Sequence, residues 1–345
     1  MDFSNFDAII DARTPSEFAE DHIPGAISAP VLYDVERAEV GTLYKQVSAF
    51  EAKKVGASLI ARNVALHIKD LFTQKPKAWR PLVYCWRGGK RSGAMAHILR
   101  EIGWDAQTLP GGYKAYRKWV VQQLELMPQQ FHFQVVHGPT GSGKSRLLAA
   151  LASAGGQVLD LERLAAHRGS VLGGLPNRPQ PSQKMFESLL LREMTGLEKD
   201  KVVYIEGESK KIGQLQVPES LIARMRASPC VRLETDTETR VTLLLQEYEF
   251  FLNNQENLYQ QLDCLVSLHG REKVAGWKAL GERGAWREFV ARLLAEHYDP
   301  AYRRSSDKNF VRLPEARAVR IAAADESAFA RAAQSLLASS ELQPA

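Results

Sequence analysis

Short hydrophobic runs alternate along the chain with longer segments in which apolar and polar residues are mixed. Five of these runs, at residues 6–10, 82–84, 133–136, 158–159 and 202–205, are bounded by turn-forming or charged residues, which is typical of buried strands. Several of the longer segments that follow them predict helices. Strands that alternate with helices form parallel sheets joined by crossover helices. The pattern therefore predicts an α/β protein.

Two domains are expected, because 345 residues exceed what one ordinary hydrophobic core organises. We predict a first parallel-sheet domain over residues 1–127, with a helical insertion at about residues 35–75. Residues 127–130, Met-Pro-Gln-Gln, are the predicted linker. A second α/β domain follows over residues 130–335, and its C-terminal part is expected to be helical. Residues 336–345 are predicted to form a flexible tail.

The charges and the few cysteines indicate the setting in which the protein works. The net charge of +5 and a pI near 9.0 permit a polyanionic partner without demanding one. The three cysteines, Cys85, Cys230 and Cys264, are too few for a disulfide framework and fit a reducing compartment. The N-terminus lacks the basic start of a signal peptide, and no apolar stretch approaches the roughly 18 residues of a membrane span. We therefore expect a cytoplasmic protein that does not associate with membranes.

Cys85 stands at the end of a predicted strand, at the head of a loop rich in glycine and cationic residues. Backbone N–H groups at a strand end before a helix converge on one point, and a thiolate needs such positive potential. The loop therefore predicts a reactive thiol with a lowered pKa and a pocket for a tetrahedral anion, rather than a buried structural cysteine. Cys230 and Cys264 lack such neighbours and are expected in the core. The predicted catalytic residues are Cys85, Arg87 and Arg91, and the surrounding anion loop contributes Gly88, Gly89, Lys90 and Ser92.

A second loop, residues 138–145, reads G-x-x-x-x-G-K-S between a predicted strand and a predicted helix. Its glycines let backbone N–H groups face phosphate oxygens, its lysine supplies a charge, and its serine can ligate Mg²⁺. The predicted phosphate-binding residues are Gly138, Thr140, Gly141, Ser142, Gly143, Lys144 and Ser145. The acidic partner of Mg²⁺ ends a later strand, and Asp160, Glu206 and Glu208 are equal candidates. No base-binding signature is present, so the phosphate ligand stays open between ATP, phosphate and another diphosphate.

The first domain resembles the rhodanese family over about residues 1–125. The matching segments, in the order of the family, are residues 11–13, 17–18, 22–26, 85–92 and 109–113. The resemblance implies that sulfur or selenium is carried on the loop cysteine as a persulfide or perselenide. Cys85 and Arg91 are separated by five residues, one more than in most single-domain rhodaneses and the same as in cysteine phosphatases and arsenate reductases. A wider loop suits a larger anion.

A rhodanese-like domain followed by a phosphate-loop domain resembles the tRNA 2-selenouridine synthase family. Further matching segments are residues 36–46, 85–89, 160–162, 167–170, 180–183 and 298–302. That family replaces the sulfur of 2-thiouridine at the tRNA wobble position with selenium from selenophosphate, through an S-geranylated uridine made with geranyl diphosphate. The resemblance implies a transferase that binds the tRNA anticodon loop, uses both co-substrates without a covalently bound cofactor, and meets an enzyme that supplies selenophosphate. On this hypothesis the Lys144 loop holds the diphosphate and the Cys85 loop holds selenophosphate.

Two basic-aromatic clusters are candidate RNA contacts, because a splayed-out base stacks on aromatic or arginine side chains. A solvated charged surface explains each cluster equally well. His22 is expected to hold its turn, and Trp86 belongs either to the core or to the wall of a substrate site. The first cluster comprises His167, Arg168, Arg178 and Lys184, and the second comprises Tyr302, Arg303 and Arg304 next to Tyr298.

Two other activities share these motifs. A sulfurtransferase acting on tRNA with thiosulfate and ATP would use both loops. A cysteine phosphatase or arsenate reductase fused to an ATPase fits the five-residue spacing, but it needs an aspartate general acid that the sequence does not identify. A non-catalytic rhodanese-like module is disfavoured by Cys85 itself.

Overall fold

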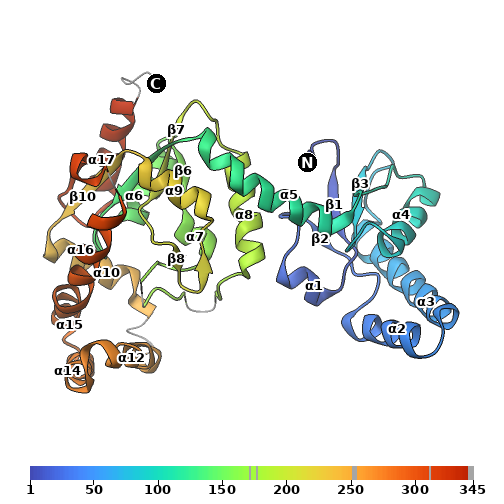
Figure 1. Ribbon diagram of the computed structural model, residues 1–345, viewed down its shortest axis with the longest axis horizontal. Coiled ribbons are helices and arrows are strands. Elements are labelled where there is room, and N and C mark those ends of the chain that lie inside the picture. Colours follow the sequence, from blue (N-terminus) through green and yellow to red (C-terminus); the bar gives the residue numbers. More distant parts are fainter. Residues whose placement is uncertain (171, 176–177, 251–254, 311, 341–345) are drawn as a thin grey trace. The chain divides into compact units, whose positions relative to one another are not determined.

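The structure is a computed structural model of the chain (Figure 1). It describes residues 1–170, 172–175, 178–250, 255–310 and 312–340, and the side chains of residues 305–309 and 340 are left aside. Contacts divide the chain into one unit of Met1–Gln123 with Pro181–Arg192 and another of Leu124–Gln180 with Glu193–Ala345. Residues 181–192, which the sequence assigns to the second domain, thus group with the first.

The first unit is built on a four-stranded parallel sheet with the order β2-β1-β3-β4. The strands are β1 (Ala8–Asp11), β2 (Ile27–Ser28), β3 (Pro81–Tyr84) and β4 (Gln107–Thr108). The helices are α1 (Pro15–Glu20), α2 (Asp34–Gln46), α3 (Ala49–His67), the π-helix η1 (Ile68–Phe72), α4 (Lys90–Ile102) and α5 (Gly112–Leu126). All four residues of β3 are buried, and β3 pairs with β1 and β4, so the strand that leads to Cys85 is internal.

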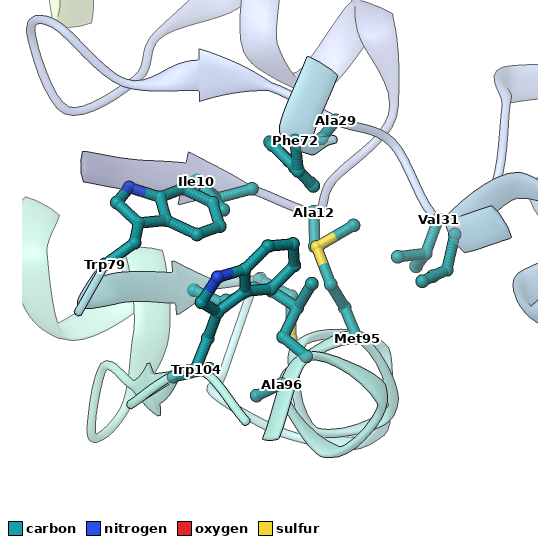
Figure 2. Close-up of a cluster of buried hydrophobic side chains, with 14 residues drawn as sticks. Ile10, Ala12, Ala29, Val31, Phe72, Trp79, Met95, Ala96 and Trp104 are labelled. Atoms are coloured by element: carbon teal, nitrogen blue, oxygen red, sulfur yellow. The ribbon is translucent and has the colours of Figure 1, made fainter. Parts of the chain in front are cut away.

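Aromatic and aliphatic side chains form a buried cluster (Figure 2), to which Cys85 also belongs. The ring of Trp79 lies 5.1 Å from that of Phe72 and 5.1 Å from that of Trp104, edge-on to the latter. Met95 and Leu99 of α4 are fully buried in the same cluster. Because burial of such side chains is the main force that fixes a helix on a sheet, this packing holds the first turn of α4 next to Cys85.

The helical insertion expected at about residues 35–75 consists of α2, α3 and η1, with α2 and α3 packed side by side (Figure 1). A buried amide fastens it to the rest of the unit. Asn63 donates through Nδ2 to the carbonyl of Val31 at 3.2 Å and to Glu36 at 2.7 Å. Glu36 also accepts from the N–H of Tyr33 at 2.8 Å, which completes the start of α2.

The second unit contains a five-stranded parallel sheet of order β11-β10-β5-β7-β6, with a small antiparallel hairpin, β8-β9. The strands are β5 (His132–His137), β6 (Gln157–Leu159), β7 (Val202–Glu206), β8 (Lys211–Ile212), β9 (Leu215–Gln216), β10 (Cys230–Thr235) and β11 (Arg317–Ile321). The predicted α/β class with parallel sheets is confirmed. Strand β5, which leads into the phosphate loop, occupies the middle of its sheet.

Helices follow most strands of the second unit, and several more form a helical C-terminal part (Figure 1). They are η2 (Met127–Gln130), α6 (Lys144–Ser153), α7 (Leu161–Ala165), α8 (Gln183–Thr195, most of which groups with the first unit), α9 (Glu219–Ala227), α10 (Thr237–Glu247), α12 (Gln255–Asp263), α13 (Val266–His269), α14 (Arg271–Glu282), α15 (Trp286–Leu293), η3 (Leu294–Tyr298), α16 (Asp299–Asn309), η4 (Leu313–Glu315) and α17 (Glu326–Ser340). None of the described helices combines the length and the apolar character needed to cross a bilayer.

Three local predictions differ from the structure. Residues 127–130 form a 3-10 turn rather than an open linker, because Met127 and Pro128 are buried. Helix α17 runs through residue 340, since Leu336 is buried in the core of the unit, so the predicted tail is helical up to that point and its last five residues lie outside the described part. Cys264 is exposed after α12 instead of buried, whereas Cys230 is buried as predicted.

Candidate active sites in the two loops

Cys85 follows β3 and is buried against the first turn of α4. The hydroxyl of Ser92 donates to Cys85 Sγ over 3.2 Å, and the same hydroxyl lies 3.2 Å from the carbonyl of Gly89. Burial acts to raise the pKa of Cys85, but the Ser92 hydroxyl, the backbone N–H groups of Ser92 and Gly89 and the charge of Arg91 outweigh it. The net pKa of Cys85 is therefore below that of an ordinary thiol, as the sequence predicts.

Arg91 is held in place by Glu17 of α1. Its Nη1 donates to Glu17 Oε2 at 2.6 Å and its Nη2 donates to Oε1 at 3.2 Å, a two-point contact that fixes the guanidinium plane. Arg87 and Lys90 are exposed at the rim, and within the described part of the chain neither has an ion-pair partner. The predicted roles thus divide: Arg91 is a positioned charge near the thiol, whereas Arg87 and Lys90 are available to an incoming anion.

The loop is braced by the turn at residues 109–113. The N–H of Tyr113 donates to the carbonyl of Cys85 at 2.8 Å, and the N–H of Lys114 donates to that of Trp86 at 3.0 Å. Gly112 has a positive φ of 58°, and a Cβ there would lie 2.2 Å from the carbonyl oxygen of Cys85. Only glycine lets the turn approach this closely, which explains why a Gly-Gly pair accompanies the cysteine loop.

A groove of ≈ 960 Å³ opens beside Cys85, between the loop and the helical insertion. Trp86 forms part of its wall, with 39% of its surface exposed and its ring 5.4 Å from that of Tyr113, so the core alternative for Trp86 is wrong. The apolar lining comes mainly from α2 and α3, through Val40, Tyr44, Ala52 and Ile60. The cationic lining comprises Arg37, Lys45, Lys53, Arg87, Lys90 and Arg91. The groove therefore suits an anionic ligand that carries an apolar part.

The second loop, residues 138–143, turns from β5 into α6 at the edge of a cavity of ≈ 730 Å³. Gly141 and Gly143 have positive φ values of 76° and 90°. A Cβ on Gly143 would lie 2.6 Å from the ring of Phe329, so the loop needs glycine there for space as well as for conformation. Lys144 Nζ reaches back to the carbonyl of Gly138 at 3.0 Å, which places its charge over the hollow of the loop. All seven predicted phosphate-binding residues line this cavity.

Carboxylates surround the phosphate loop, and one was missed by the sequence reasoning. Ser145, the serine that could ligate Mg²⁺, donates through Oγ to Glu162 Oε2 at 2.8 Å. The carboxylate that contacts this serine is therefore Glu162 and not one of the three predicted candidates. Asp160 accepts from the N–H of Arg163 at 2.7 Å and caps α7, while Glu206 accepts from the N–H of Glu162 at 2.6 Å. The only signal for Glu162 was its place two residues after Asp160.

Burial raises the pKa of each of these carboxyl groups. Desolvation is the main cause for Asp160, Glu162 and Glu206, and the neighbouring carboxylates add to it. Burial and the charge of Glu162 raise the pKa of Glu208 to about 8. A bound cation would offset the repulsion between these carboxylates. Ser145 and Glu162 supply oxygen ligands of the kind that Mg²⁺ prefers.

Arg240 and Asp299 position the phosphate loop from outside it. Arg240 donates through Nε and Nη2 to the carbonyl of Thr140, at 3.0 and 2.8 Å. Asp299 accepts from the same guanidinium at 3.1 and 2.6 Å, and Arg240 is buried. Thr235 Oγ1 donates to the carbonyl of Ser142 at 2.9 Å. These contacts turn two loop carbonyls away from the cavity and leave the N–H groups to face a phosphate.

Four of the seven candidate RNA contacts lie in one cavity. His167, Arg168, Arg178 and Tyr302 line the phosphate-loop cavity. Burial lowers the pKa of His167. Arg168 lies with its guanidinium 4.7 Å from the Tyr248 ring and donates to the carbonyl of Glu247 at 2.6 Å.

The other three candidates are placed differently. Lys184 is on α8, where its Nζ lies 2.6 Å from Glu20 in the first unit, because residues 181–192 pack there. Arg303 and Arg304 are exposed on α16 outside the lining of the cavity. His22 stacks on Phe18 at 3.8 Å, and its Nδ1 lies 2.9 Å from the Phe18 carbonyl, in keeping with the expected structural role.

Comparison with known proteins places both loops in one family. A family model described as a rhodanese-like domain matches residues 1–118, and one described as the tRNA 2-selenouridine synthase AAA domain matches residues 131–269. The N-terminal domain of a putative ATP/GTP binding protein from Clostridium difficile 630 is 35% identical, with a TM-score of 0.30, covering 33% of this chain and 88% of that one.

Several curated proteins are similar over most of the chain. The tRNA 2-selenouridine synthases of Nitrosomonas europaea and Bdellovibrio bacteriovorus are each 37% identical over 70% of this chain, and the match spans 63% and 64% of their lengths. The tRNA 2-selenouridine synthase of Sulfurovum sp. is 33% identical over 88% of this chain and 90% of its own length. The chain therefore belongs to the tRNA 2-selenouridine synthase family.

Proposed function

We propose that the protein replaces the sulfur of a wobble 2-thiouridine in tRNA with selenium, in two steps that use the two loops separately. The observation that carries this proposal is the thiol of lowered pKa in a cation-rimmed groove, on the same chain as a complete phosphate loop. One site prepares a nucleophile, and the other is suited to a diphosphate leaving group. Replacement of sulfur in a nucleobase needs both, because sulfur must first become a good leaving group.

The first step is alkylation at the phosphate loop. The sulfur of 2-thiouridine attacks C1 of geranyl diphosphate, the C1–O bond breaks, diphosphate leaves, and the N3 proton of the base passes to water. Lys144, the loop N–H groups and a Mg²⁺ held by Ser145 and Glu162 would stabilise the charge that develops on that diphosphate. His167, Arg168 and Tyr302, which line the same cavity, are suited to hold the uridine.

The second step is selenium transfer at Cys85. Selenium in selenophosphate is already at the selenide level, so a perselenide on Cys85 would require an oxidant. Attack of the Cys85 thiolate on phosphorus requires none: the S–P bond forms, the P–Se bond breaks, and hydroselenide is released. Hydroselenide then attacks C2 of the S-geranylated uridine, the C2–S bond breaks, and geranylthiol leaves. Water hydrolyses the phosphocysteine to phosphate and restores the thiol.

Three features support this role of the cysteine loop. The five residues between Cys85 and Arg91 are the spacing of cysteine phosphatases, which also attack phosphorus with a thiolate. Arg91 is oriented by Glu17, while Arg87 and Lys90 are left for the oxygens of the anion. The apolar wall from α2 and α3 suits the geranyl group of the leaving thiol.

The test uses the full chain with an anticodon stem-loop RNA that carries wobble 2-thiouridine, followed by nucleoside mass spectrometry. Geranyl diphosphate alone should give S-geranyl-2-thiouridine, and later addition of selenophosphate should give 2-selenouridine. Sulfur exchange with thiosulfate and ATP, in place of selenation, would instead establish the sulfurtransferase alternative. Hydrolysis of an aryl phosphate without any change in the RNA would establish the phosphatase alternative.

The chemistry at Cys85 is tested with selenophosphate labelled at each atom in turn. Acid-quenched enzyme should carry ³²P but no ⁷⁵Se on Cys85. Enzyme that carries ⁷⁵Se without ³²P would show a perselenide and would overturn attack on phosphorus, while leaving the overall replacement reaction intact. Cys85→Ser should carry neither label.

A further inference from the structure

A narrow apolar slot of ≈ 60 Å³ adjoins the phosphate-loop cavity in the second unit. It lies between two hydrophobic clusters, one on α12, α14 and α15 and the other on α10 and η3. Thr140, Leu244, Tyr248 and Tyr298 line both the slot and the cavity, so the two spaces share a wall. Phe289 lines the slot and not the cavity.

Contact with the phosphate loop is direct on one side of the slot. A Cβ on Gly141 would lie 2.7 Å from Leu244, so the Leu244 side chain rests on the loop backbone. The same backbone is held by Arg240 through the carbonyl of Thr140. When the phosphates of a ligand occupy the loop, the atoms bonded to those phosphates therefore lie beside the slot.

The lining restricts what can enter. Beyond its mouth the slot is walled by leucine, valine and aromatic side chains, which offer no partner to the polar edge of a base or to ribose hydroxyls. At the mouth, the hydroxyls of Ser170 and Tyr248 lie 3.4 Å apart and interact with each other. A hydrocarbon chain has no polar group that would be left without a hydrogen bond in such a space, and its apolar surface is removed from water.

We propose that the slot binds the isoprenoid chain of a prenyl diphosphate whose diphosphate lies on the Lys144 loop. This rests on the alkylation step proposed above and adds the site of the chain. The chain enters past Tyr248 and Tyr298, and Phe289 limits its length. The C1 carbon is then held at the junction of slot and cavity, where an incoming thiocarbonyl can reach it.

Binding of a ligand series to the full chain tests the slot. Affinity should rise from pyrophosphate to dimethylallyl diphosphate to geranyl diphosphate, by about tenfold or more for each isoprene unit that is buried. Farnesyl diphosphate should gain nothing over geranyl diphosphate, because the slot ends. Equal affinity for pyrophosphate and geranyl diphosphate would overturn the proposal.

Variants on α15 separate the slot from the phosphate loop. Val290 is half-buried in the slot lining, and Val290→Trp should lower geranyl diphosphate affinity to that of pyrophosphate while pyrophosphate binding stays unchanged. Glu288→Trp on the exposed side of the same helix is the matched control and should bind like wild type. Val290→Ala, which risks no overpacking, should instead improve farnesyl diphosphate binding several-fold. Unchanged selectivity in both Val290 variants would exclude the slot.

Lys144→Ala distinguishes failure of the slot from failure of the alkylation proposal. Suppose that Lys144→Ala loses both pyrophosphate and geranyl diphosphate binding, while the wild type shows no preference for chain length. This result would keep the diphosphate on Lys144 and reject the slot as the site of the chain. Geranyl diphosphate binding that survives Lys144→Ala but falls in Val290→Trp would place the chain in the slot and reject Lys144 as the diphosphate site.

Discussion

The Cys85 loop and the Lys144 loop have the same construction and opposite electrostatics. Each follows an internal parallel strand, turns on glycines of positive φ and opens a helix. Around Cys85 the cations Arg87, Lys90 and Arg91 have one carboxylate partner among the residues that the structure describes, Glu17 on Arg91, and the pKa of the thiol is lowered. The same loop geometry can therefore be tuned by its neighbours.

Around Lys144 the balance is reversed. Glu162, Glu206 and Glu208 interact with one another beside this loop, and burial raises the pKa of each carboxyl. Neighbouring carboxylates raise it further, Asp160 for Glu162 and Glu162 for both Glu206 and Glu208. In the function proposed above, the electropositive loop would supply a nucleophile, whereas the loop beside the carboxylates would hold a leaving diphosphate together with Mg²⁺. The strand–loop–helix frame thus suits an anion in both loops, and the surrounding side chains set what each loop can do with it.

Substitution of Cys85 or Lys144 should give the largest effects, and each substitution should slow a different step. Cys85→Ser should lower selenation by at least about 10³-fold, because oxygen is a far poorer nucleophile here, and should leave geranylation intact so that S-geranyl-2-thiouridine accumulates. Lys144→Ala should lower geranylation by at least about 10²-fold through loss of charge stabilisation. Nucleoside mass spectrometry measures both. If Lys144→Ala spared geranylation and removed only selenation, the division of labour between the loops would be wrong.

Breaking the brace of the phosphate loop should have the next largest effect. Asp299→Ala leaves the buried guanidinium of Arg240 without its carboxylate, and we expect the free energy of unfolding to fall by about 3 kcal/mol in urea titrations. Glu238 lies on α10, the helix that carries Arg240, and forms an exposed ion pair with Arg287. Glu238→Ala should lower the free energy of unfolding by less than about 1 kcal/mol. Equal losses in the two variants would mean that Arg240 does not depend on Asp299.

This brace also marks the limit of what the sequence can predict. Both loops were recognised because each lies within one short segment, between a buried strand and a helix, where local pattern decides the structure. Arg240 is 100 residues from Thr140, and Asp299 is 59 residues further on, so nothing in local spacing connects them. Such contacts follow from how the helices pack on the sheet.

The same reason explains two other misses. Glu17 contacts Arg91, which is 74 residues away along the chain, and no local pattern pairs this glutamate with the predicted catalytic arginine. Lys184 was grouped with His167 because both lie in the segment between two predicted strands. Its helix packs with the first unit instead, where Arg117 pairs with Glu187 and Lys184 with Glu20. Closeness along the chain therefore does not predict closeness in space for residues on a helix that packs against a different unit.

The carboxylates at the phosphate loop should make stability depend on pH in a way that the cysteine loop does not. Native Glu208 keeps its proton up to about pH 8, whereas in the unfolded chain a glutamate loses it near about pH 4.3. Between these values the native state binds more protons, so the free energy of unfolding falls as pH rises. Glu208→Gln should flatten this decline, and its advantage over wild type should be greatest near pH 8.

Mg²⁺ and a second glutamate supply the controls for that pH profile. Mg²⁺ should favour ionised Glu208 and Glu162, so its binding should tighten as pH rises toward 8 and should restore stability there. The pKa of Glu219 is lowered by its hydrogen bond to Lys210, so this side chain is ionised in both the native and the unfolded state above about pH 5. Glu219→Gln should therefore leave the slope of the free energy of unfolding between about pH 5 and 8 unchanged. A wild-type profile that is flat between pH 5 and 8 would remove the electrostatic contrast between the loops.

The smallest expected effect concerns the thiol itself. Ser92 donates one hydrogen that Cys85 and the Gly89 carbonyl share, and ionisation of the thiol directs it to sulfur. Ser92→Ala should therefore move the pH midpoint of Cys85 alkylation by iodoacetamide upward, toward the value of about 8.5 for a free thiol. Ser92→Thr retains the hydroxyl and should keep the low midpoint. If Ser92→Ala left the midpoint unchanged, the backbone N–H groups and Arg91 alone would hold the thiolate, and the loop would resemble the Lys144 loop in relying on its main chain.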